Sequence, residues 1–84
     1  MDLYQQNTSL FDEVLDFLSS TPTPSQIIDF KPSDTLQGRV RTLLDRNRNE
    51  TLTAEEQTEL DEFERINHFM SMLKIRARKK LADS

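Results

Sequence analysis

The feature that most constrains the fold is a long stretch free of helix breakers: residues 54–81 contain neither glycine nor proline. Thr53 stands just before this stretch and Glu56 lies three positions after Thr53, which is the capping-box pattern of a helix start. The sequence therefore predicts one continuous helix over residues 54–81, about 42 Å long at about 1.5 Å per residue.

This predicted helix is apolar on two sides. Its main stripe has the spacing of a helix face that packs on a core. The stripe comprises Leu60, Phe63, Ile66, Met70, Leu73, Ala77 and Leu81. Phe69, Met72 and Ile75 fall progressively off that stripe and reach the opposite side. Because one short helix cannot cover both sides, we expect another chain to cover the second one.

An N-terminal helix is predicted over residues 7–19, where apolar side chains recur at helical spacing. Thr8 or Ser9 can cap its start. The prolines that follow end it, since proline lacks an N–H and disfavours helix in the residue before it. Residues 26–30 are apolar and β-branched, and they predict a short extended segment docked on helices, because no partner strand is evident.

A further helix is predicted over residues 33–47. Ser33 is a good N-cap, and Asp34 and Gln37 have the spacing of a capping box. Leucine and valine side chains form an apolar stripe along it, and arginines fill much of the remainder. This helix and the long one that follows it predict a helical hairpin.

We therefore expect an all-α fold with one long C-terminal helix. Its parts are a short N-terminal helix within residues 1–20, a Pro-containing linker or extended segment over residues 21–32, and the helical hairpin over residues 33–82. A chain of 84 residues forms only a small core. It has no cysteine, which excludes disulfides and a Cys-based zinc site, and its single glycine excludes a glycine-rich phosphate loop.

The sequence shows no targeting or membrane segment. Its opening residues do not have the pattern of a signal peptide, and no stretch approaches the roughly 18 consecutive apolar residues of a membrane span. We therefore expect a cytoplasmic protein without a membrane partner.

Charge is strongly segregated along the chain, although its formal net value is only −4. Within the predicted long helix, residues 54–67 have a balance of −5 and residues 68–81 a balance of +5. The helix dipole explains acids in the first turn and bases in the last turn, but its effect fades beyond one turn. The alternative is antiparallel pairing of two copies, which places each acidic half against a basic half and predicts a homodimer.

The loop between the two hairpin helices has features of a calcium-binding loop. Over residues 45–56, Asp45, Asn47 and Asn49 occupy the first three oxygen-ligand positions and Glu56 the closing one. The sixth position, which is normally glycine, is Glu50, and arginines alternate with the ligands. The competing interpretation is a plain turn between helices in which Asn47 or Asn49 adopts the left-handed conformation.

The remaining candidates for chemistry are sparse. His68 is the only histidine; it lies on the second side of the long helix and has no cysteine or evident nucleophile to work with. We therefore expect an interface role for His68, no catalysis and no cofactor. The arginine and lysine clusters allow a small nucleic-acid-binding regulator as an alternative, but the sequence pI of about 4.9 opposes contact with a polyanion outside a complex.

Five short stretches, in this order, resemble a family of small helical proteins common in cyanobacteria. They are IDFKPS (28–33), LTAEE (52–56), ELDEF (59–63), HFM (68–70) and KIRAR (74–78). In that family the gene often directly precedes one for an HNH-type nuclease, in the manner of a toxin–antitoxin operon. The resemblance covers residues 27–81 and implies an antitoxin that inhibits the nuclease.

The resemblance and the second apolar side together predict a partner-binding surface. We expect it to contain Glu59, Glu62, His68, Phe69, Met72, Ile75 and Arg76. The acidic half of the long helix would face the basic nucleic-acid groove of the nuclease, or the apolar side chains would anchor the contact while charges set its register.

Overall fold

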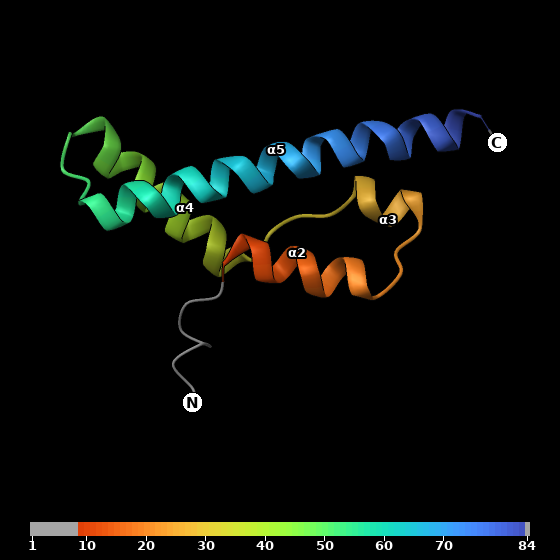
Figure 1. The fold of residues 1–84 in the computed structure, drawn as a ribbon, viewed down its shortest axis with the longest axis horizontal. Coiled ribbons are helices and arrows are strands. Elements are labelled where there is room, and N and C mark those ends of the chain that lie inside the picture. Colours follow the sequence, from red (N-terminus) through yellow and green to blue (C-terminus); the bar gives the residue numbers. More distant parts are fainter. Residues whose placement is uncertain (1–8, 84) are drawn as a thin grey trace.

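The computed structural model describes residues 9–83 and contains four α-helices and no strand over that range (Figure 1). These are α2 (Leu10–Ser19), α3 (Pro24–Ile28), α4 (Asp34–Arg48) and α5 (Ala54–Ala82). The predicted all-α class and long C-terminal helix are confirmed. The 29 residues of α5 correspond to about 43 Å, so α5 runs along most of the longest molecular dimension of 48 Å.

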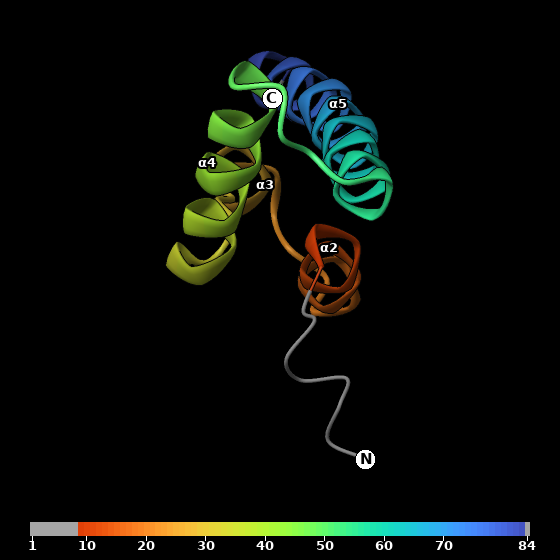
Figure 2. The same cartoon turned by 90° about the vertical axis from the view of Figure 1, so that its left-hand side faces the viewer.

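The other three described helices all pack against α5. Figure 1 shows α4 running back across the first half of α5, which confirms the predicted hairpin, whereas α2 lies along the middle of α5 and α3 along its later part. Viewed along α5, the helices α2, α4 and α5 form three sides of the molecule (Figure 2). None of the helices within residues 9–83 is both long and apolar enough to cross a bilayer.

The expected extended segment is instead the short helix α3, and the sequence prediction is wrong there. Thr23 accepts a hydrogen bond from the backbone N–H of Gln26, and the Gln26 side chain accepts one from the Thr23 N–H at 2.9 Å. Pro24 follows at the first helical position, where no N–H is needed. The proline that looked like a helix breaker therefore starts a helix, and this helix docks on α5 as expected.

Side-chain caps define the starts of α2 and α4. Ser9 caps α2 by accepting from the Asp12 N–H at 3.1 Å, so α2 begins later than predicted; Thr8 lies outside the described residues. Ser33 caps α4 by accepting from the N–H of its first turn. The expected Asp34–Gln37 capping box does not form, because Ser33 is the N-cap and Asp34 is already the first helical residue; the Gln37 side chain donates to the carbonyl of Pro32.

One apolar core joins α2, α4 and α5. Leu10, Val14, Leu36 and Met70 are its buried residues. Half-buried apolar side chains surround them, namely Phe17, Leu18, Phe30, Val40, Phe63, Ile66 and Leu73. The predicted main stripe of α5 is buried or half-buried except for Leu81, which is exposed because it lies in the last turns of α5, beyond α3 (Figure 1).

Three contacts hold the segment between α2 and α4 against α2 and α5. The Phe17 and Phe30 rings lie 4.7 Å apart between centroids, and Lys74 Nζ donates to the Phe30 carbonyl at 2.9 Å. Glu13 of α2 accepts from both the N–H and the hydroxyl of Ser33, at 2.8 and 2.6 Å. The expected linker is therefore packed structure, and it fixes where α4 begins.

Candidate functional site

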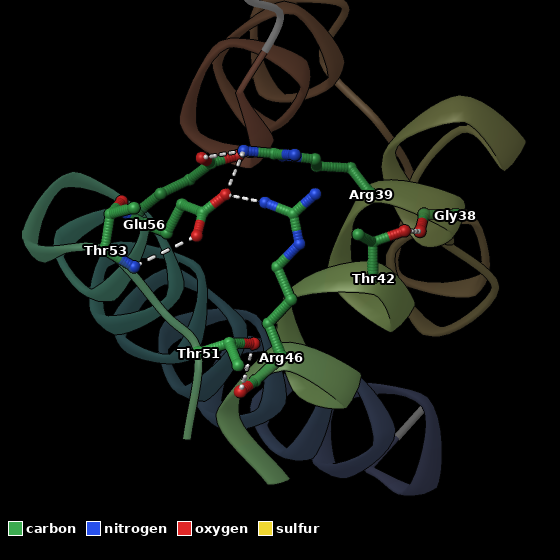
Figure 3. Close-up of polar contacts among 8 residues, drawn as sticks. Gly38, Arg39, Thr42, Arg46, Thr51, Thr53 and Glu56 are labelled. Carbon is green, nitrogen blue, oxygen red and sulfur yellow. Dashed lines mark hydrogen bonds and ion pairs between the residues drawn. The ribbon is translucent and has the colours of Figure 1, made fainter. Parts of the chain in front are cut away.

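The arginines of α4 lie against the acidic half of α5. Arg39 Nε and Nη2 donate to the two carboxylate oxygens of Glu59, both at 2.9 Å, and Nη2 also lies 3.9 Å from Glu56 Oε2. Arg46 forms a second ion pair with the same Glu56 carboxylate (Figure 3). Glu56 also closes the predicted capping box, since Thr53 N–H donates to Glu56 Oε1 at 3.1 Å. Part of the acidic charge is thus neutralised within the chain.

These contacts shift the acid–base behaviour of the residues involved. The hydrogen bond to Glu59 raises the pKa of Arg39. The same hydrogen bond, helped by the positive charge of Arg39, lowers the pKa of Glu59. The pKa of Glu56 is lowered first by the backbone hydrogen bond from Thr53 and further by Arg46 and Arg39. Arg39, Glu56 and Glu59 therefore remain in the charged state that the ion pairs need at neutral pH.

Glu59, which the sequence predicts to face a partner, is consequently engaged by Arg39. The sequence carried a signal for this contact. Arg39 and Arg46 are seven residues apart and so share one face of α4. A hairpin places that face against the first turns of the next helix, where Glu56 and Glu59 are three residues apart.

The other predicted partner-binding residues are exposed to solvent. We define the outer face of α5 as the exposed residues Asp61, Arg65, His68, Phe69, Met72, Ile75, Arg76 and Lys79. Phe69, Met72 and Ile75 are 45%, 47% and 62% exposed. The predicted second apolar side of α5 is therefore confirmed as a face that the described part of the chain leaves uncovered. His68 lies within this face, and its interface role stays a prediction.

The structure also contains a groove that the sequence did not predict. It has a volume of about 650 Å³ and lies between the start of α2, α4 and the first half of α5. Its apolar lining includes Phe11 and Val40, and its α5 wall carries Glu55 and the predicted partner-binding residue Glu62. The groove exists because α4 and α2 diverge from α5, which depends on docking angles that no local pattern encodes.

The candidate calcium loop does not bring its ligands together. Asp45 and Asn47 lie inside α4, where residues two apart point in different directions, and Asn49 is the C-cap. The Asp45 carboxylate pairs with Arg48, and Glu56 is held by α4 as described above. Among the residues that the structure describes, no three His, Cys, Asp or Glu side chains are grouped as a metal ion requires.

The turn after α4 is instead a Schellman motif. The Glu50 N–H donates to the Asn47 carbonyl, and the Thr51 N–H donates to the Arg46 carbonyl at 2.8 Å. Glu50 has a φ of 59°, so the left-handed residue is Glu50 and not Asn47 or Asn49 as the plain-turn interpretation expected. Glu50 occupies the position that calcium loops fill with glycine, and it does have a positive φ. The Schellman motif that ends α4 accounts for this φ, and no metal ion is needed to explain it.

The two basic clusters differ in their availability. Arg39, Arg46 and Arg48 of α4 are paired with carboxylates of the chain. Arg76 and Lys79 of α5 are exposed and form no ion pair within residues 9–83. Arg76 and Lys79, like the exposed and unpaired Arg41 of α4, therefore keep a charge that no carboxylate within residues 9–83 neutralises.

The comparisons with known proteins add no relative. A scan against protein-family models matches no family, and searches of curated proteins and of solved structures return no match.

Proposed function

We propose that this chain is a non-catalytic protein-binding module that acts through the outer face of α5, as an antitoxin-like inhibitor of an HNH-type nuclease. The observation that carries the proposal is the row of three large apolar side chains exposed on one rigid helix, Phe69, Met72 and Ile75. Apolar side chains concentrated in this way, with charges around them, are typical of the anchors of a protein interface.

The charges around the apolar row suit a nuclease partner. Exposed acids occupy the first half of α5, among them Glu55, Asp61, Glu62 and Glu64. A nuclease binds nucleic acid through a basic surface, so this acidic half is complementary to it and would steer and orient the encounter. The complex would form in the cytoplasm, where the nuclease would otherwise reach its substrate.

Coexpression tests this function. We expect the adjacent gene to encode an HNH-type nuclease, and the chain, carrying an affinity tag, is produced together with that gene's product. We expect the nuclease to co-purify and its toxicity to be suppressed. Phe69→Asp and Met72→Asp should abolish both effects, because a carboxylate would be buried without a partner in the interface.

Leu44→Asp is the matched control, since Leu44 is an equally exposed apolar residue on α4, away from the outer face. It should leave binding and rescue intact. Circular dichroism confirms that each variant is helical. A wild-type chain that neither retains the nuclease nor suppresses its toxicity contradicts the proposal.

A further inference from the structure

We infer that the outer face of α5 pairs two copies of this chain, with the two α5 helices antiparallel and the two-fold axis beside residue 70. The inference rests on the proposed function, because it names a second copy as an occupant of the same protein-binding face, which the reversible pair must release before that face binds the nuclease. Four observations carry it: the spacing of the exposed residues, the register that this spacing permits, the distribution of unpaired charge and the position of the apolar row.

The spacing is that of a coiled-coil seam. Asp61, Arg65, His68, Met72, Ile75 and Lys79 follow one another at intervals of four, three, four, three and four residues. This alternation places all six on one narrow strip of a helix. Every one of them is exposed, so the strip is accessible along about five turns of α5.

The strip is symmetric about residue 70. Asp61 and Lys79 each lie nine residues from it, Arg65 and Ile75 five, and His68 and Met72 two. In an antiparallel pair with its two-fold axis at this height, each residue therefore meets the other member of its own pair. The register places Asp61 of each copy opposite Lys79 of the second copy, and His68 opposite Met72.

The charges favour this orientation over a parallel one. Within residues 9–83, Glu62, Arg76 and Lys79 form no ion pair, whereas Glu56 and Glu59 are already used by α4. The antiparallel register brings Arg76 of the second copy beside Glu62 and Lys79 beside Asp61, twice by symmetry. A parallel pair would instead align like charges, which is unfavourable.

The apolar residues gather at the centre of the same contact. Phe69 lies next to the axis and therefore approaches Phe69 of the second copy. Met72 packs over His68, and Ile75 packs on the aliphatic part of Arg65. Each of the three apolar side chains is close to half exposed or more in the single chain, so pairing removes apolar surface that water otherwise contacts. Because only three such residues contribute from each copy, we expect a reversible dimer.

Sedimentation velocity on the full chain over a range of concentrations tests the inference, with two charge-reversed variants. One is Asp61→Lys combined with Glu62→Lys, and the other is Arg76→Glu combined with Lys79→Glu. We expect the wild-type chain to approach the mass of a dimer as its concentration rises. Each variant alone should have a dissociation constant raised by more than about tenfold, because like charges then face each other at both ends of the contact.

The decisive measurement is an equimolar mixture of the two variants. A mixed pair restores opposite charges at both ends, so the mixture should dimerise at concentrations at which each variant alone is still mainly monomeric. The control is the charge-reversing substitution Arg41→Glu on α4, at an exposed position away from the strip. It should leave dimerisation unchanged. Circular dichroism checks that every variant keeps its helix content.

A wild-type chain that stays monomeric at all concentrations overturns the inference, as does a mixture of variants that remains monomeric. So does a dimer that persists in both variants, since its contact must lie elsewhere. The outcome for the proposed function is separate. If the chain is monomeric but still retains the nuclease, only self-association is rejected. If mixing the variants restores the dimer but the chain retains no nuclease, only nuclease inhibition is rejected.

Discussion

At the scale of single residues, Arg39 determines how much of the acidic run remains available. Its guanidinium engages Glu59 with two parallel hydrogen bonds and also approaches Glu56. A planar guanidinium suits this two-point contact, and lysine could not reproduce it. The acids of α5 are thereby divided into a set bound to α4 and a set, including Glu62, that stays exposed.

We expect Arg39→Ala to lower the free energy of unfolding by about 0.5–1 kcal/mol, the usual range for a half-exposed ion pair with good geometry. Arg41→Ala is the matched control, because Arg41 is exposed and forms no ion pair in the described part of α4. Urea unfolding followed by circular dichroism measures both. Equal effects of the two substitutions would show that the Arg39–Glu59 contact does not stabilise the fold.

The lowered pKa values of Glu56 and Glu59 make stability depend on pH in a defined direction. A carboxyl whose pKa is lower in the folded chain stabilises it above the unfolded value, and that stabilisation is lost as pH falls through the folded value. We therefore expect the unfolding midpoint to fall as pH decreases below the ordinary value of 4.5. Glu59→Gln should flatten this dependence, as measured by thermal unfolding between neutral pH and pH 3; an unchanged profile would contradict it.

At the scale of elements, the ends of the helices depend on residues in contact within one or two turns. The capping box of α5 joins Thr53 and Glu56, which are neighbours in sequence, and it forms as predicted. The same holds for α3, where Thr23 and Gln26 form an equivalent box. The sequence contained that second signal, but the two prolines beside it favoured a linker interpretation. The position of a proline relative to a cap therefore matters more than its presence.

The end of α4 provides a prediction at this scale. Glu50 has a positive φ, which costs an L-residue more than glycine. We expect Glu50→Gly to raise the free energy of unfolding by about 0.5–1 kcal/mol. Asn49→Gly is the control, since Asn49 has a φ of −91° and glycine there only adds freedom to the unfolded chain. Denaturant unfolding compares them; a loss of stability in Glu50→Gly would refute the expected relief of strain.

At the scale of the whole molecule, docking decides which apolar residues form the core. Leu43 and Leu44 are adjacent in α4 and both belong to its predicted stripe, yet Leu43 is 1% exposed and Leu44 is 41% exposed. We expect Leu43→Ala to cost about 3 kcal/mol and Leu44→Ala less than about 1 kcal/mol. Thermal unfolding distinguishes them, and similar losses at both sites would contradict this packing of α4 on α5.

What the sequence alone determined are the properties that depend on residues a few positions apart: the all-α class, the position of α5, its capping box and its two apolar sides. Tertiary structure alone decided that Leu81 stays exposed, that Leu43 is buried while Leu44 is not, and which exposed acid of α5 Arg39 binds, namely Glu59 and not Glu62. The physical reason is distance along the chain. Caps and periodicity arise from contacts within one or two helical turns, whereas burial and ion pairing across helices depend on how segments some 20 or more residues apart are docked.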